Sequence, residues 1–236
     1  MVDRSPSKLL PRGVRFRELT TAPRGLLSRA EKAEGQAEAL EKLVNIDELT
    51  NLLNRRGLMK KFEQHVDRMR SNREERRVGD DSELAVVFID LDKFKRVNDM
   101  LGHGIGDKLL VDFAKSLKEH LRANDIVARY GGDEVVLVLP VSGEDDLRQI
   151  LFDRKGSRGE DVSVIGRVRR GMPKLRVGYD LSVGYSMVDR GELNGLGGSE
   201  AFKLAAERAD QMMYKEKNRK KAPLGKLRNL FSSVLG

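Results

Sequence analysis

The sequence of 236 residues contains no cysteine and no tryptophan, and only 5% of its residues are aromatic. Without cysteine, the chain can form no disulfide framework, no thiolate metal site and no cysteine nucleophile. The absence is compatible with the reducing environment of the cytoplasm, where we expect the protein to be located. So few aromatic rings are also poor material for a surface that stacks nucleic-acid bases.

Long apolar runs are lacking as well. No stretch of the sequence approaches the ~20 apolar residues that a membrane-spanning helix needs. The N-terminus is basic but lacks the apolar segment of a signal peptide. We therefore expect neither a membrane span nor a secretion signal.

Positive charge is in excess, because 45 Lys and Arg outnumber 37 Asp and Glu and give a net charge of +8 at pH 7. This balance suits an anionic partner, and a nucleotide, a nucleic acid and a membrane surface all qualify. The case for a nucleic acid rests on charge alone, since no nucleic-acid-binding module is recognisable, and we expect no such partner. With 39% hydrophobic and 35% charged residues, the composition is that of a globular domain with terminal extensions.

Both ends of the chain differ from its middle. Residues 1–25 combine three prolines with many arginines and are predicted to form a basic flexible arm. Residues 26–45 are predicted to form an amphipathic helix, whose role stays open between packing on its own domain and pairing two copies of the chain. Its apolar residues recur at alternating spacings of four and three, as in a heptad seam, at Leu26, Ala30, Ala33, Ala37, Leu40 and Val44. For the C-terminal tail, 222–236, a solvated end is favoured over a membrane contact.

Residues 46–221 are predicted to form one α/β domain. Four strand-like runs are separated by helical periodicity, and two of the runs are joined only by a four-residue turn, which predicts a hairpin. The predicted elements are strands at 84–90, 126–130, 135–139 and 181–188 and helices around 109–121, 144–152 and 201–213. Their β-α-β-β-α-β order is that of a ferredoxin-like split βαβ sheet, an α+β sandwich. Residues 153–174 have no clear period and are predicted to form a hairpin or a mobile loop.

Carboxylates mark two places in this sheet. Asp90 ends a buried strand, and Asp133 and Glu134 lie at the tip of the hairpin. Because the split βαβ order makes the first strand and a hairpin strand neighbours at the centre of the sheet, these carboxylates can converge. Clustered oxygen ligands suit Mg²⁺, which takes one or two carboxylates together with substrate phosphates.

Positive charge and glycine accompany the carboxylates. Lys95 and Arg129 lie close in sequence to them, while Gly131 and Gly132 allow a bulky ligand to approach the backbone. Each feature alone has an ordinary structural explanation, such as a hairpin tip or a helix cap, and the sequence has no Walker-type loop. Together they indicate phosphoryl transfer, in which positioning and charge stabilisation supply most of the catalysis.

These motifs resemble those of GGDEF-domain diguanylate cyclases, over roughly residues 45–221. The matching segments, in the family's order and spacing, are 47–56 (DELTNLLNRR), 88–99 (FIDLDKFKRVND), Gly102-His103, Gly106-Asp107, 129–134 (RYGGDE), 181–184 (LSVG) and Ala209-Asp210 with Tyr214. The resemblance implies a nucleotidyl cyclase type of fold and the condensation of two GTP molecules into cyclic di-GMP by a pair of domains. The partners expected from it are GTP, cyclic di-GMP and a second copy of the chain.

The resemblance also implies residue roles. Asp90, the carbonyl of Leu91 and Asp133 would bind Mg²⁺, with Mn²⁺ as the alternative metal. Asp133 and Glu134 would take part in deprotonating the attacking 3′-hydroxyl, and the sequence leaves open which of the two accepts the proton. Lys95 would stabilise the triphosphate, and Arg129 and Lys217 would be further phosphate contacts. Asn98 and Asp107 would read the guanine edge, with His103 close to the substrate.

One further motif implies regulation. Arg122 and Asp125 match the RxxD site at which members of the family bind cyclic di-GMP as an inhibitor. Val135 departs from the family pattern, because it replaces the Phe that ends the GGDEF motif. The terminal segment 217–221 lacks the usual glycine, and no sensory domain is recognisable before the core. These departures keep open an alternative in which the domain is a catalytically weak or inactive receptor for GTP or cyclic di-GMP.

Overall fold

The computed structural model describes residues 44–71, 83–188 and 190–221, and the chain divides into two units, 1–44 and 45–236. The predicted basic arm, all but the end of the predicted helix at 26–45, and the tail at 222–236 lie outside the described residues. Within the described ranges, no helix has the length and apolar character to cross a membrane. The fold described below is that of the second unit.

A four-stranded antiparallel sheet forms the centre of this unit, in the order β2-β3-β1-β4. The strands are β1 (Glu83–Asp92), β2 (Ile126–Gly131), β3 (Glu134–Val141) and β4 (Asp180–Val188). The first strand lies beside the second strand of the hairpin, so the predicted split βαβ topology is confirmed. The apolar run in β1 is continuous because both faces of the strand are covered.

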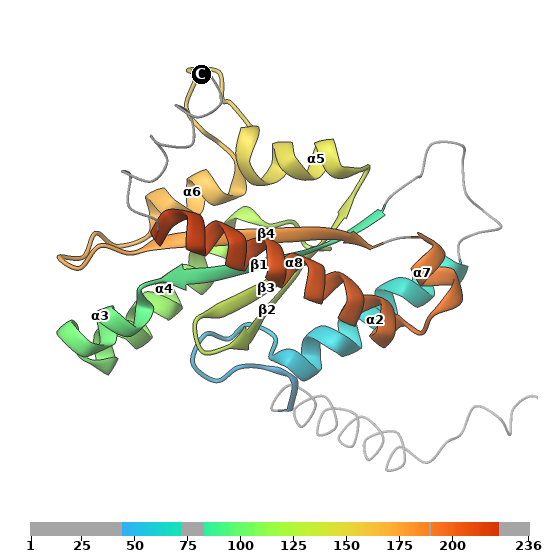
Figure 1. Ribbon diagram of the computed structural model, residues 1–236, viewed down its shortest axis with the longest axis horizontal. Helices are drawn as coiled ribbons and strands as arrows, with labels where there is room; N and C mark the ends of the chain where they lie inside the picture. Colours follow the sequence, from blue (N-terminus) through green and yellow to red (C-terminus); the bar gives the residue numbers. More distant parts are fainter. Residues whose placement is uncertain (1–43, 72–82, 189, 222–236) are drawn as a thin grey trace, which may run out of the picture. The chain divides into compact units, whose positions relative to one another are not determined.

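Helices cover both faces of the sheet (Figure 1). Ala85, Val87 and Ile89 of β1 face a core formed with α3 (Phe94–Leu101), α4 (His103–His120), α5 (Glu144–Arg148) and α6 (Val164–Gly171). Leu84, Val86 and Phe88 face a second core formed with α2 (Arg55–Ser71), α7 (Arg190–Gly195) and α8 (Gly198–Lys221). A π-helical turn, η2 (Gln149–Asp153), continues α5.

The prediction for 153–174 is wrong over part of the segment. An isolated antiparallel bridge pairs Lys155 with Asp161, but residues 164–171 form helix α6. Ser163 caps this helix, because its hydroxyl accepts a hydrogen bond of 3.1 Å from the backbone N–H of Gly166. The helix buries Val164, Ile165 and Val168 in the core that it shares with α4 and η2. A helix of only eight residues is too short to show a clear hydrophobic period.

Helix α8 lies unusually close to the sheet. A Cβ atom placed on Gly184 of β4 would lie 2.1 Å from the carbonyl oxygen of Ala209 and 2.2 Å from the amide nitrogen of Met213. Only glycine therefore lets the helix backbone rest directly on the strand. This close packing fixes where the following turns of α8 run, and they carry Lys217 and Lys220.

Candidate active site

The end of β1 meets the tip of the β2–β3 hairpin. Asp90 is paired with Glu134 in the strand register, and the backbone N–H of Leu91 donates a hydrogen bond of 3.3 Å to the carbonyl oxygen of Asp133. Asp90 itself is only 4% exposed. The predicted convergence of the strand-end and hairpin carboxylates is therefore present in the structure.

Lys217 of α8, which the resemblance implies as a phosphate contact, lies at this convergence and pairs with Asp90. Its Nζ lies 2.7 Å and 2.8 Å from the two carboxylate oxygens of Asp90. Burial acts to lower the pKa of Lys217, but the hydrogen bond to Asp90 and the charges of Asp90, Asp133 and Asp92 outweigh it and raise the pKa. Lys217 is thus held in its charged form next to the carboxylates.

The hairpin carboxylates are electrostatically crowded. Burial and the neighbouring charge of Asp90 raise the pKa of Asp133 above its usual range. Burial raises the pKa of Glu134 too, together with the charges of Asp90, Asp133 and Asp210. Like charges held this close favour the binding of a cation, because a cation removes the repulsion between them.

A divalent metal fits this donor set. Among the residues that the structure describes, no three Asp, Glu or His side chains are grouped closely enough to hold a metal ion by themselves. Mg²⁺ does not require such a group, since it commonly uses one or two carboxylates and completes its shell with phosphate oxygens and water. Asp90 and Asp133 are the side chains, and Leu91 the carbonyl, that would hold it, and Lys217 would then share Asp90 with the metal.

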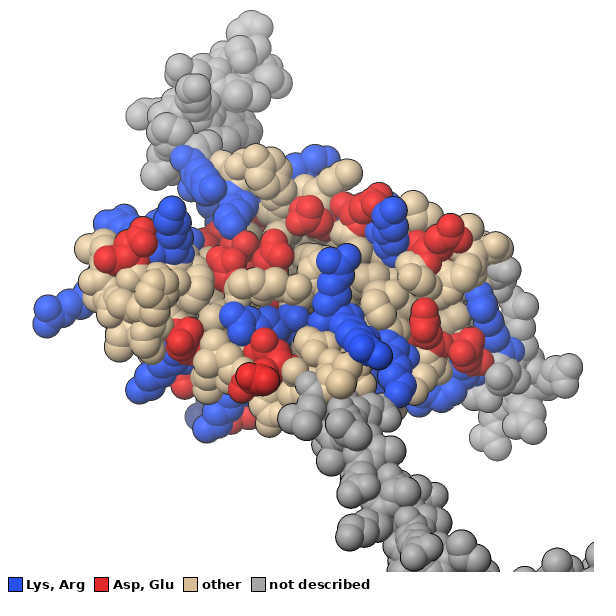
Figure 2. Space-filling model, turned by 90° about the horizontal axis from the view of Figure 1, so that it is seen from below, with Lys and Arg blue, Asp and Glu red and all other residues tan. Residues whose placement is uncertain are grey.

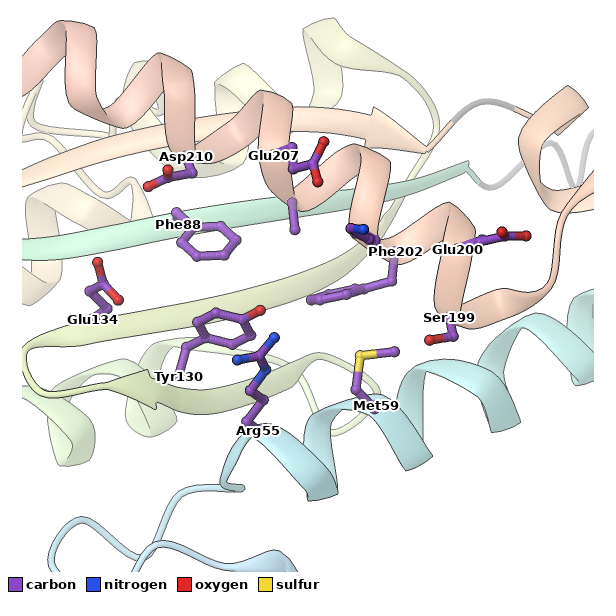
Figure 3. Close-up of a pocket in the computed structure, with 12 residues that line it drawn as sticks. Arg55, Met59, Phe88, Tyr130, Glu134, Ser199, Glu200, Phe202, Glu207 and Asp210 are labelled. Carbon is purple, nitrogen blue, oxygen red and sulfur yellow. The ribbon is translucent and has the colours of Figure 1, made fainter.

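Glu134 and Val135 lie on opposite faces of the sheet. Val135 is 2% exposed and packs into the core formed with α4, whereas Glu134 lines a hollow on the α8 side. This hollow of about 480 Å³ lies between α2, α8 and the sheet, and Phe88, Tyr130 and Phe202 provide its aromatic wall (Figure 3). The replacement of the family Phe by Val135 therefore changes the packing behind the hairpin without touching the side on which Glu134 lies.

Arg129 has partners that the sequence did not predict. Its Nη1 lies 3.1 Å from both carboxylate oxygens of Asp47, and its Nε and Nη2 donate to the carbonyl oxygen of Gly132 at 3.0 Å and 2.8 Å. Asp47 in turn accepts hydrogen bonds from the backbone N–H and the hydroxyl of Thr50. The guanidinium therefore ties the 47–54 segment to the Gly-Gly turn, and its role as a phosphate contact stays a prediction.

The predicted base-reading residues lie on α3 and at the start of α4. Asp107 and His103 are exposed, and Asn98 is partly buried. The Oδ1 atom of Asn98 is buried and has no hydrogen-bond partner. Lys95 is exposed in the first turn of α3, three residues after the end of the strand that carries Asp90 and Asp92.

Comparison with known proteins identifies the family of the chain. Residues 44–154 match the family model described as diguanylate cyclase, GGDEF domain. The chain belongs to the GGDEF domain family. The resemblance seen in the motifs is thereby confirmed, and so is the nucleotidyl cyclase type of fold, because similar solved structures include a diguanylate cyclase and a GGDEF domain.

Three similar proteins illustrate the match. The diguanylate cyclase DgcP of Pseudomonas aeruginosa is 32% identical over 179 residues, which are 72% of this chain and 22% of DgcP. The crystal structure of the diguanylate cyclase SiaD of P. aeruginosa, in complex with its activator SiaC, has a TM-score of 0.60 at 27% identity and covers 86% of this chain and 69% of that one. A microbial GGDEF domain studied with bis-(3′,5′)-cyclic di-GMP has a TM-score of 0.53 at 25% identity, over 76% of this chain and 94% of that one.

The curated relatives are longer proteins. The chain spans 15–26% of the length of the curated relatives that it matches. The match therefore concerns the GGDEF domain, and it says nothing of the other parts of those proteins.

The RxxD residues of this GGDEF domain occupy a tight turn after α4. The backbone N–H of Arg122 donates to Oδ2 of Asp125 at 2.7 Å, and the backbone N–H of Asp125 donates to the carbonyl oxygen of Arg122 at 3.0 Å. Burial raises the pKa of Asp125, against the opposing effects of the Arg122 N–H and guanidinium. The turn thus holds the exposed Arg122 beside Asp125, in the pairing that the motif implies.

A hollow of about 410 Å³ adjoins this turn, and the sequence did not predict it. Asp125, Asn124 and Ala123 line it together with basic side chains from two helices, which are Lys61, His65 and Arg68 of α2 and Lys118 of α4. Burial and the charge of Arg68 lower the pKa of His65. Helices α2 and α4 are far apart in sequence, so only the folded chain reveals that their basic side chains surround one hollow.

The surface charge of the GGDEF domain is mixed. Figure 2 shows Lys and Arg side chains interspersed with Asp and Glu on the face that it presents. On that face, several blue side chains adjoin one another across the centre, and red side chains lie around them.

Proposed function

We propose that this chain is a diguanylate cyclase that condenses two GTP molecules into cyclic di-GMP and two pyrophosphates. The observation that carries the proposal is the convergence of Asp90, the Asp133–Glu134 hairpin and Lys217 at one edge of a GGDEF domain. Three carboxylates beside a partly buried ammonium group are suited to a metal-bound triphosphate, since metal and cation together neutralise the charge of the transferred phosphoryl group.

The reaction requires the same step twice. The 3′-oxygen of one GTP forms a bond to the α-phosphorus of the other, the bond between that phosphorus and the bridging oxygen breaks, and pyrophosphate leaves. The proton of the 3′-hydroxyl passes to Asp133 or Glu134, whose raised pKa values suit a proton acceptor better than ordinary carboxylates. Bound Mg²⁺, or Mn²⁺ in its place, would supply charge neutralisation at the phosphates.

Each domain holds one GTP in this proposal, so two copies of the chain must meet. Lys95 and Lys217 would contact the triphosphate, while Asn98, Asp107 and His103 would hold the base end of the nucleotide. The helix predicted at 26–45 is our candidate for pairing the copies, and the cytoplasm, which supplies GTP, is the proposed location. Arg122 and Asp125 would bind the product and limit its accumulation.

Incubation of the purified chain with GTP and Mg²⁺ tests the proposal. Chromatography should detect cyclic di-GMP, and a coupled assay should detect two pyrophosphates for each product molecule. The same incubation with ATP should give no cyclic product, because adenine presents the opposite donor pattern to a site built for guanine. Binding of GTP or cyclic di-GMP without pyrophosphate release would instead identify a receptor, and the absence of both would refute the proposal.

A further inference from the structure

Gly106, in the first turn of α4, lies against the side chain of Asn98 on α3. A Cβ atom placed on Gly106 would lie 1.8 Å from Oδ1 of Asn98, 2.9 Å from its Cγ and 3.3 Å from Cζ of Phe94. Separations below 3.0 Å essentially never occur for a real Cβ atom. The amide of Asn98 therefore occupies the place that any side chain at position 106 would need.

The backbone does not explain this glycine. Gly106 is a buried helical residue, and it is not among the described glycines with positive φ, which are Gly102, Gly143 and Gly159. In a helix interior, glycine is less stable than alanine, because it restricts the backbone less in the unfolded chain. The space taken by Asn98 is what requires glycine at this position.

The contact also sets the orientation of the Asn98 amide. Of the Asn98 side-chain atoms, Oδ1 lies nearest to the position that a Cβ atom on Gly106 would take. The amide nitrogen of Asn98 is not among the three atoms closest to that position. Oδ1 is buried on this side without a hydrogen-bond partner. The NH₂ end is left to face away from Gly106 and is free to donate.

A donor in that place distinguishes guanine from adenine. Guanine carries an acceptor oxygen at C6, whereas adenine carries an amino donor there. Asp107 directly follows Gly106, and its carboxylate can accept from the guanine ring N–H and 2-amino group. Asn98 and Asp107 together complement the guanine edge only when the Asn98 amide presents its NH₂ group to the base.

We infer that Gly106 is a positioning residue for nucleotide selection, which holds the donor end of Asn98 toward the base by offering no side chain of its own. The inference rests on the proposed function, in which this edge receives the base of GTP. A methyl group at position 106 would push Asn98 out of its place, while Asp107 and the phosphate contacts would be retained.

The test compares nucleotide binding by Gly106→Ala and the native chain. α,β-Methylene analogues of GTP and ATP serve as probes, because they bind without being cleaved, and calorimetry measures both affinities in Mg²⁺. We expect the affinity for the guanine analogue to fall about 10- to 100-fold, in line with the loss of a hydrogen bond from a site built to make it. The affinity for the adenine analogue should stay within about 2-fold, since it does not use that donor.

Gly104→Ala is the matched control. Gly104 lies in the same turn of α4, is exposed and has no atom within 4 Å of the position of a Cβ. This variant changes helix propensity in the same way but should leave both affinities unchanged. Asn98→Ala should lose guanine preference by itself, and Gly106→Ala added to it should change the affinity by less than about 2-fold, because coupled residues are not additive.

The outcomes separate the inference from the proposed function. Failure of the native chain to prefer the guanine analogue refutes the proposed function at this edge. A native preference that Gly106→Ala retains in full overturns the inference alone. If Gly106→Ala does not fold, as judged by circular dichroism, Asn98→Ala/Gly106→Ala should recover the folded domain because the clash is removed, and its failure to do so also overturns the inference.

Discussion

Lys217 places its ammonium group between the two carboxylate oxygens of Asp90, 2.7 Å and 2.8 Å away, across 127 residues of sequence. The Asp90 side chain is 5% exposed and that of Lys217 is 24% exposed. An ion pair this enclosed differs from a surface pair, because the removal of one partner leaves a buried charge without compensation. The Asp90–Lys217 pair therefore contributes to the stability of the domain and also lies at the site where the phosphates would bind.

Lys217→Met tests this relationship. We expect the free energy of unfolding to fall by about 3 kcal/mol, the lower end of the range for a broken buried pair, because Lys217 is partly exposed. Added Mg²⁺ should restore part of the loss by binding the freed Asp90, which urea titrations with and without the metal will measure. Lys215→Met, on an exposed position of the same helix, is the control and should change little. Equal stability of the two variants would show that the pair contributes nothing.

Asp133→Asn addresses the chemistry. The substitution keeps the shape of the side chain but removes a charged ligand from the hairpin tip. We expect turnover of GTP to fall by about 10²-fold or more, as for the loss of one electrostatic stabiliser of a transition state. Steady-state release of pyrophosphate measures the effect, and native turnover by Asp133→Asn would rule out its assignment as a metal ligand.

The bond between Asp47 and Arg129 predicts a dependence of stability on pH. Burial would raise the pKa of Asp47, but the hydrogen bonds from Thr50 and Arg129 and the charge of Arg129 lower it below its ordinary value of 3.8. A carboxylate whose pKa is lowered by folding stabilises the fold at pH values above its pKa in the unfolded chain. This contribution is lost as the pH falls through its pKa in the folded chain.

Asp47→Asn should therefore lower the free energy of unfolding at pH 7 by about 1.5 kcal/mol, the lower end of the range for a hydrogen bond to a charged group, because both side chains are partly exposed. The difference from the native chain should persist to pH 5 and shrink as the pH falls below 3.8. Urea titrations at pH 7, 5, 4 and 3 measure it, and Asp153→Asn, at an exposed carboxylate, serves as the control. A difference that is the same at pH 3 and pH 7 would contradict the ionic origin of the bond.

The hydrophobic pattern predicts the sheet well and the partners of individual side chains poorly. Strands such as β1 are predictable because a continuous apolar run has few other structural explanations. The short turn at Gly131–Gly132 predicts the hairpin. The neighbours of Asp90 then follow from topology alone. These local and topological rules are sufficient to bring the carboxylates together.

Other features depend on contacts that no local pattern encodes. The motif around Arg129 predicts a phosphate contact, but the structure pairs Arg129 with the carboxylate of Asp47, which lies 82 residues away in the sequence. Helix α2 was not predicted, although Asn54 directly before it is an N-cap residue whose Oδ1 accepts a hydrogen bond of 3.0 Å from the backbone N–H of Gly57. The eight-residue helix α6 escapes detection because too few apolar positions define its period.

Gly184→Ala tests the close packing of α8 on β4. Because the added methyl group would meet backbone atoms of Ala209 and Met213, it cannot be accommodated by a side-chain movement. We expect a loss of at least about 3 kcal/mol in the free energy of unfolding, the upper end of the range for overpacked cores. Gly178→Ala, where a Cβ meets no atom within 4 Å, should be tolerated. Similar urea midpoints for the two variants would show that the helix can move away from the strand at little cost.

Arg122→Ala tests feedback control at the RxxD turn. The exposed guanidinium can contact a phosphate or a guanine edge with two donors, and Asp125 beside it can accept from guanine. Cyclic di-GMP offers both kinds of group, and the adjoining basic hollow, with Lys61 and Arg68, adds positive charge for its phosphates. The turn leads into β2, which carries Arg129 toward the catalytic hairpin, so product bound there lies outside the proposed catalytic site.

Such control has a thermodynamic consequence, because the coupling between two binding sites is reciprocal. If product favours an unproductive pairing of domains, productive pairing must weaken product binding by the same factor. Arg122→Ala should retain the initial rate but continue past the product concentration at which the native chain stalls, and calorimetry should show much weaker binding of cyclic di-GMP. Arg148→Ala, an exposed arginine on α5, should stall as the native chain does. If Arg122→Ala stalls at the same product concentration, or if the native chain binds no cyclic di-GMP, the motif is an ordinary surface turn.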